Sequence, residues 1–151
     1  MAYYPFNGNT KDMSGNKNHG RVTGATFADD RHGTRQNACF FDGNSDYIEI
    51  EHSETVNFFN PNYTITMWLK FPSQAGNSHG YSAPFIKARM EKPYTGPTIF
   101  ARSNANGTLD FREAGGAEVA SIKSELDNNL WRHFTFMKRG LIYLIFIGGE
   151  L

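Results

Sequence analysis

Residues 64–71 read Thr-Ile-Thr-Met-Trp-Leu-Lys-Phe, and an aliphatic or aromatic side chain recurs at every second position of this stretch. Successive side chains of a β-strand point to opposite faces of its sheet. The pattern therefore predicts a strand that is buried on one face. The buried face would carry Ile65, Met67, Leu69 and Phe71, and the other would carry Thr64, Thr66, Trp68 and Lys70.

Shorter strand-like runs lie further along the chain, separated by turn residues; they are residues 84–88, 98–102, 109–112, 119–122, 131–137 and 141–147. Residues 138–140 join the last two as a tight turn. Upstream, residues 40–41 and 47–51 flank an Asp-Gly turn, which predicts a hairpin. Helix signals are limited to residues 54–59 and 124–127. Many short strands with Gly, Asn and Pro turns predict an all-β fold, an antiparallel β-sandwich of the jelly-roll type.

Length and composition fit this expectation and exclude several functions. The 151 residues suit one domain, which buries roughly 70% of its unfolded surface. The 15 Lys and Arg residues balance 15 Asp and Glu residues, so the charge expected of a nucleic-acid binder is missing. No apolar run has the length of a membrane span. Cys39, the single cysteine, excludes an internal disulfide and a multi-thiolate zinc site, and we expect it to be an inert, buried side chain.

Four motifs carry a family resemblance; they are residues 3–26 with their Asn, Gly and Lys-rich turns, residues 38–50, residues 63–70 and residues 131–136. In this order they resemble the laminin-G-like jelly rolls of the concanavalin A-like lectin/glucanase superfamily, in the form common in bacterial surface and secreted proteins. The resemblance spans nearly the whole chain. It implies a single domain, residues 1–151, belonging to a larger extracellular or cell-surface protein, although the sequence itself shows no signal peptide.

The resemblance also has a departure at the C-terminal end. Family members carry further strands after the segment that matches residues 141–151, and these closing strands return to the sheet. We therefore expect an incomplete sandwich with unpaired strand edges. Such edges pair readily with another chain, so the sequence predicts self-association.

A calcium site is the first candidate for chemistry. Asp12, Ser14 and Asn16 place oxygen-bearing side chains at alternate positions around Gly15, and calcium prefers several oxygen ligands. The spacing is not that of an EF-hand, because the twelfth position counted from Asp12 is a threonine. The resemblance implies a structural calcium in this loop. The alternative is that these side chains only cap turns through hydrogen bonds to the backbone.

A sugar-binding face is the second candidate. Trp68 shares a strand face with Thr66 and Lys70, and His133 shares one with Thr135. If the two strands are neighbours, Trp68 and His133 line one side of a sheet. Loop residues that we expect to reach this face are Tyr81, Tyr94, Asn104 and Asn106. The ligand would be a carbohydrate or a glycoprotein. The alternative is that Trp68 and Trp131 pack in the core and that His133 is buried and hydrogen-bonded.

A catalytic pattern is the third candidate. Residues 49–54, Glu-Ile-Glu-His-Ser-Glu, are similar to the Glu-x-Asp-x-x-Glu signature of retaining glucanases in the same superfamily. The similarity implies Glu49 as nucleophile, Glu54 as acid/base and Glu51 as an assisting carboxylate. Retaining chemistry needs two carboxyl groups about 5–5.5 Å apart, whereas positions five apart on a straight strand are separated by about 16 Å. The alternative is a solvated strand face followed by a loop.

The sequence therefore predicts a non-catalytic carbohydrate-binding or adhesive module. A glucanase-like glycoside hydrolase and a purely structural domain without a ligand remain alternatives.

Overall fold

The computed structural model describes residues 1–58, 60–71, 81–87, 96–102, 108–113, 118–123 and 129–148. These residues form β-strands and one short 3-10 helix, η1 (Glu54–Val56). The strands are β1 (Gly20–Thr23), β2 (Thr26–Ala28), β3 (Ala38–Phe40), β4 (Tyr47–Ile50), β5 (Asn62–Lys70), β6 (Tyr81–Ile86), β7 (Thr98–Arg102), β8 (Thr108–Arg112), β9 (Glu118–Lys123), β10 (Trp131–Arg139) and β11 (Ile142–Ile147). The predicted all-β fold is confirmed, and every pairing between the strands is antiparallel.

The chain divides into two compact units, Met1–Asn57 and Phe58–Leu151. In the first unit β1 pairs with β4 and β2 pairs with β3. The predicted hairpin between residues 40–41 and 47–51 is therefore wrong. Residues 20–28 and 38–50 run antiparallel to each other in two ladders, and residues 41–46 leave the ladder opposite Gly24.

Local hydrogen bonds close the loop of residues 41–46. The Asp42 carboxylate accepts a hydrogen bond from the backbone N–H of Asn44, and the Asp46 carboxylate accepts one from the N–H of Asp42. Asp and Asn side chains often close turns in this way. The loop is therefore closed by hydrogen bonds between its own residues, and the strands on either side of it pair with the same partner segment, residues 20–28.

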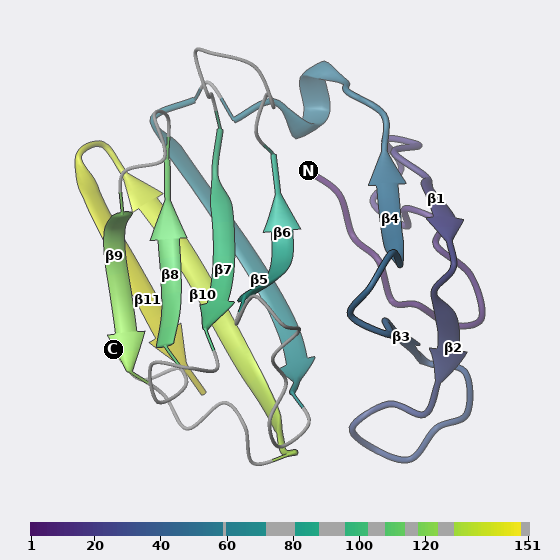
Figure 1. The fold of residues 1–151 in the computed structure, drawn as a ribbon. Helices are drawn as coiled ribbons and strands as arrows, with labels where there is room; N and C mark the ends of the chain where they lie inside the picture. Colours follow the sequence, from purple (N-terminus) through teal and green to yellow (C-terminus); the bar gives the residue numbers. More distant parts are fainter. Residues whose placement is uncertain are drawn as a thin grey trace. The chain divides into compact units, whose positions relative to one another are not determined.

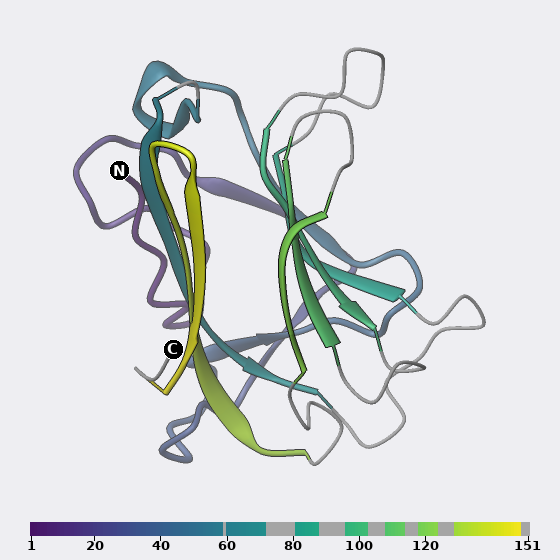
Figure 2. The ribbon, with the colours of Figure 1, turned by 90° about the vertical axis from the view of Figure 1, so that its left-hand side faces the viewer.

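The second unit is a β-sandwich. β11, β10 and β5 form a three-stranded sheet in that order, and β6, β7, β8 and β9 form a four-stranded sheet. The four-stranded sheet lies in front of the other in Figure 1, and Figure 2 shows the two sheets of this unit as separate layers. The side chains between them form the core: Ile65, Ile99, Ala101, Leu109, Phe111, Phe134, Phe136 and Ile145.

Each predicted strand of the second unit is present, with shifts at some of the ends. The alternation over residues 64–71 is confirmed in β5, where Ile65 is buried in the core, Met67 and Leu69 pack against it, and Thr66, Trp68 and Lys70 are exposed. The strand expected at residues 84–88 is β6, which begins earlier, at Tyr81. Pro84 is tolerated there because β6 is an edge strand and its register shifts between Ser82 and Phe85.

The C-terminal hairpin is confirmed, with its turn displaced by one residue. β10 runs to Arg139, which lies opposite Ile142, so the turn residues are Gly140 and Leu141. Gly140 has a φ of 61°, the conformation that a type II′ hairpin turn requires at its first central position. The one-turn helix expected within residues 54–59 is η1, whereas the one expected at residues 124–127 lies outside the described residues.

Candidate functional site

The Trp68–His133 pair stands at the centre of the candidate site. β5 and β10 are neighbours, and Trp68 lies directly opposite His133 in their register. The two ring centroids are 5.2 Å apart and the ring planes are tilted by 49°. Trp68 remains 44% exposed. The prediction that these residues line one side of a sheet is confirmed, and the alternative that Trp68 is a core residue is wrong.

Two further cross-strand pairs flank these rings. Thr66 lies opposite Thr135, and Lys70 lies opposite Trp131. The six residues form a surface that we call the Trp68 face; they are Thr66, Trp68, Lys70, Trp131, His133 and Thr135. Their strand neighbours of opposite parity, such as Phe134, point into the sandwich core.

The Trp68 face has the chemistry of a site for an amphipathic ligand. An exposed indole offers a flat apolar surface, and its N–H group is a hydrogen-bond donor. The threonine hydroxyls and the imidazole of His133 both donate and accept hydrogen bonds. A sugar ring has C–H faces, which suit the flat indole surface, and hydroxyl groups at its edges, which suit the hydrogen-bonding side chains.

Of the four loop residues expected beside this face, the structure describes the backbone of Tyr81, which does not belong to the same sheet. The backbone of Tyr81 begins β6, opposite Arg102, and β6 belongs to the four-stranded sheet rather than to the sheet of Trp68. Tyr94, Asn104 and Asn106 lie outside the described residues. The candidate site therefore rests on β5 and β10.

The Asp12 loop is organised by hydrogen bonds. Oδ1 of Asp12 accepts from the backbone N–H groups of Tyr3 and Ser14, at 3.0 and 2.8 Å. Oδ2 accepts from the backbone N–H and the side-chain amide of Asn18, at 3.0 and 3.1 Å. Burial by itself would raise the pKa of the Asp12 carboxyl, but the hydrogen bonds from Ser14, Tyr3 and Asn18 outweigh it, and the pKa is well below its ordinary value.

This arrangement does not fit a calcium ion bound by Asp12. A carboxylate has about four lone-pair sites, and all of them face N–H donors here. Ser14 and Asn16 donate to the carbonyl oxygen of Met1, at 3.0 and 2.7 Å. Within the described ranges, no group of three or more His, Cys, Asp and Glu side chains is placed to hold a metal. The geometry favours the turn-capping alternative, and calcium stays a prediction to be tested.

The acidic pattern at residues 49–54 does not form an enclosed carboxylate pair. Glu49 is half-exposed on β4 and pairs with Arg21 directly across the strands, at 2.5 Å. Glu54 is exposed at the start of η1 and accepts a hydrogen bond from the side chain of Asn57. Glu51 is exposed between them. This geometry supports the solvated strand face rather than a nucleophile and an acid.

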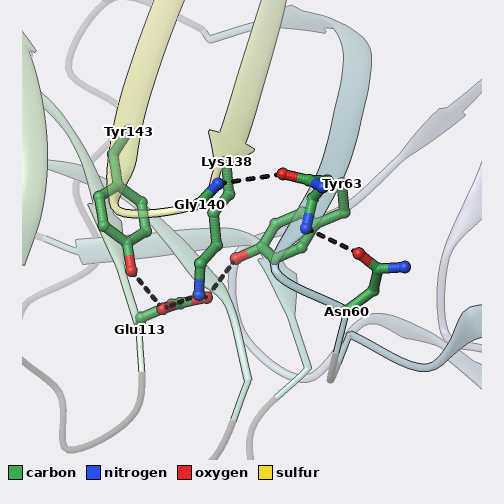
Figure 3. A network of polar contacts seen from close by, with 7 residues as sticks. Asn60, Tyr63, Glu113, Lys138, Gly140 and Tyr143 are labelled. Atoms are coloured by element: carbon green, nitrogen blue, oxygen red, sulfur yellow. Dashed lines mark hydrogen bonds and ion pairs between the residues drawn. The ribbon is translucent and has the colours of Figure 1, made fainter.

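A polar cluster that the sequence motifs do not predict lies between the two sheets of the second unit. Glu113 follows β8 and accepts hydrogen bonds from Tyr63 on β5, Lys138 on β10 and Tyr143 on β11 (Figure 3). Burial opposes ionisation of Glu113, but the hydrogen bonds from Lys138 and the two tyrosines lower its pKa. Burial and the bond to Glu113 raise the pKa of Tyr63. The only sequence signal is that these three partners occupy core-facing positions of their strands.

The second unit is an antiparallel β-sandwich that carries aromatic and polar side chains on the outer face of one sheet. The model of the family described as Clostridium neurotoxin, N-terminal receptor binding, matches residues 7–143. This match covers most of the 151 residues, and the chain belongs to that family. The family consists of non-catalytic receptor-binding domains, in agreement with the prediction of a binding module.

No curated protein and no solved structure matches the chain significantly. In the part of the chain that the structure describes, no helix is both long and apolar enough to span a membrane.

Proposed function

We propose that the chain is the carbohydrate-binding part of a receptor-binding domain, and that the Trp68 face is its contact surface. The observation that carries the proposal is the exposed indole of Trp68, which lies against His133 on two hydrogen-bonded strands. Family membership supports a role in receptor binding. The chemistry of the face supports a glycan as the part of the receptor that is bound.

The position of the face on a sheet favours recognition over chemistry. Side chains on paired strands are held more precisely than side chains on loops, so less ordering is needed when a ligand binds. Trp68 supplies a stacking surface, and Thr66 and Thr135 add hydroxyl groups two positions along the same strands. Lys70 adds a positive charge on the other side of Trp68, which would favour ligands that carry an acidic group.

We also infer the superfamily of the domain, its location and its partner. The β-sandwich and the four motifs support placing the chain in the laminin-G-like group of the concanavalin A-like superfamily. The family of neurotoxin receptor-binding domains supports an extracellular location, as part of a bacterial protein that is secreted. Its partner would then be a glycoprotein or a glycolipid on a target cell.

The test is binding of the chain to an array of neutral and acidic glycans, followed by titration of the best ligand. Substituting alanine for a central aromatic contact residue typically costs more than about 1 kcal/mol of binding free energy. We therefore expect Trp68→Ala and His133→Ala each to weaken binding by roughly fivefold or more.

Tyr47→Ala is the matched control, because Tyr47 is a comparably exposed aromatic residue of the first unit, at 49%. It should leave the affinity unchanged. Binding that survives Trp68→Ala would move the site away from the Trp68 face. No binding to any glycan would support the alternative of a domain without a carbohydrate ligand.

A further inference from the structure

β11 is an edge strand without the usual features that prevent association. It lies at the end of the three-stranded sheet and pairs only with β10 among the described strands. Its sequence, Ile-Tyr-Leu-Ile-Phe-Ile, has no charged residue and no proline. Natural edge strands are usually short, charged, bulged or interrupted by proline, because a regular apolar edge pairs with other chains.

The register identifies the backbone groups at this open edge. Residues of an antiparallel pair alternate between those that exchange hydrogen bonds and those that do not. The N–H of Gly148 donates to the carbonyl oxygen of His133, at 2.9 Å. Even-numbered residues of β11 therefore direct their N–H and C=O groups toward β10. The corresponding groups of Tyr143, Ile145 and Ile147 point away from β10, toward the edge.

Both faces of β11 are apolar. Ile145 is part of the sandwich core, and Tyr143 and Ile147 pack against that core. Leu144 and Phe146 lie on the opposite face and are half-buried. A regular edge strand whose side chains are apolar on both faces is a template for pairing with another strand.

We propose that this strand is β11 of a second copy of the chain, paired antiparallel across a two-fold axis. Ile145 then lies opposite the partner's Ile145, and Tyr143 lies opposite the partner's Ile147. Each such pair exchanges two backbone hydrogen bonds. On the outer face, Leu144 lies opposite the partner's Phe146.

A second copy is favoured because β11 is complementary to itself. Antiparallel pairing about Ile145 joins core-facing side chains to core-facing side chains and outer side chains to outer ones. No charge lies at any of the paired positions. The chain as a whole has zero formal net charge at pH 7, so two copies do not repel each other at long range.

The first test is sedimentation velocity of the full chain over a range of concentrations, where we expect a reversible dimer. Leu144→Lys with Phe146→Lys places like charges opposite each other at both outer pairs, which destabilises a sheet. We expect this variant to weaken dimerisation at least about tenfold. The variant with Glu at both positions should do the same. An equimolar mixture of the two should form a heterodimer, because each Lys then faces a Glu.

Circular dichroism of each variant alone shows that it is folded before the mixture is interpreted. Leu141→Lys is the matched control, since Leu141 is 93% exposed at the turn of the same hairpin and lies outside the pairing. It should leave the dimerisation constant unchanged. A wild-type chain that stays monomeric at all concentrations would overturn the proposal, and so would a Lys and Glu mixture that does not associate.

Amide hydrogen exchange separates edge pairing from stacking of the two outer faces. Edge pairing protects the N–H groups of Tyr143, Ile145 and Ile147, and their protection should increase with protein concentration. Those of Leu144 and Phe146 already donate within the sheet and should change less. A dimer in which the three edge amides stay as exposed as in the monomer would contradict the pairing.

Discussion

The carboxylate of Glu113 accepts two hydrogen bonds from the ammonium group of Lys138, each 2.7 Å long, and this ion pair joins the two sheets of the second unit. Glu113 extends from the four-stranded sheet, and Lys138 lies on the central strand of the other. Tyr63 and Tyr143 donate to the two remaining carboxylate positions. The polar groups of the cluster are thus satisfied by one another, as burial between two apolar layers requires.

Replacing Glu113 with Gln should destabilise the chain. The substitution leaves the Lys138 ammonium with a weaker partner, and the side chains of both residues are only 17% and 16% exposed. We expect a loss of about 2 kcal/mol in the free energy of unfolding. Urea denaturation followed by circular dichroism measures it.

Glu49→Gln is the control for that measurement, because it removes a carboxylate from the ion pair with Arg21, whose side chains are 51% and 77% exposed. Exposed ion pairs contribute at most about 1 kcal/mol. Equal losses for the two variants would show that the cluster adds nothing beyond a surface contact.

The contribution of Glu113 should depend on pH in a defined direction. Its pKa is lower in the folded chain than in the unfolded chain, where it has the ordinary value of about 4.3. The stabilisation is therefore complete above the unfolded pKa and is lost as pH falls through the folded pKa. The difference in stability between wild type and Glu113→Gln should be constant near neutral pH and shrink on acidification. A difference that grows as pH falls would contradict this assignment.

Calcium should not stabilise the first unit through Asp12. Both oxygens of this carboxylate accept N–H groups, so a calcium ion would have to displace hydrogen bonds from Tyr3, Ser14 or Asn18. We expect the same melting temperature in the presence of calcium and in the presence of a chelator. Asp12→Asn should lower the melting temperature equally in both conditions, because an amide cannot accept all four bonds. A calcium-dependent rise in wild type that Asp12→Asn abolishes would restore the metal site.

The sequence predicts those parts of the fold in which neighbouring residues determine the structure. The alternation in residues 64–71 places Trp68 outside and Ile65 inside, because side-chain direction in a strand depends only on parity. The hairpin of β10 and β11 is likewise local, since its turn joins strands that are adjacent in the chain. Parity puts Trp68 and His133 on one side of the sheet once β5 and β10 are neighbours, whereas their direct pairing is set by the strand register, which the sequence pattern does not give.

Such local patterns do not predict which residues far apart in the chain will be in contact. Residues 41–46 have the composition of a hairpin turn, but β4 finds its partner in β1, more than 20 residues upstream, and only the tertiary arrangement decides this. Glu113 is separated from Lys138 by 25 residues and from Tyr63 by 50. A lysine at a core-facing position of a strand indicates a buried partner, but it does not identify that partner.

Gly24 should tolerate substitution less well than another glycine with the same backbone conformation. Gly24 has a φ of 75°, and a Cβ atom added there would lie 2.0 Å from Oδ1 of Asp46. Gly33 has a φ of 77°, but no atom lies within 4 Å of its added Cβ. Gly33→Ala therefore measures the cost of the left-handed conformation alone, about 1–2 kcal/mol. Gly24→Ala carries that cost and also displaces Asp46, which closes the loop of residues 41–46. We expect a larger loss of stability in urea denaturation, and equal losses for the two variants would show that the Asp46 side chain moves away at no cost.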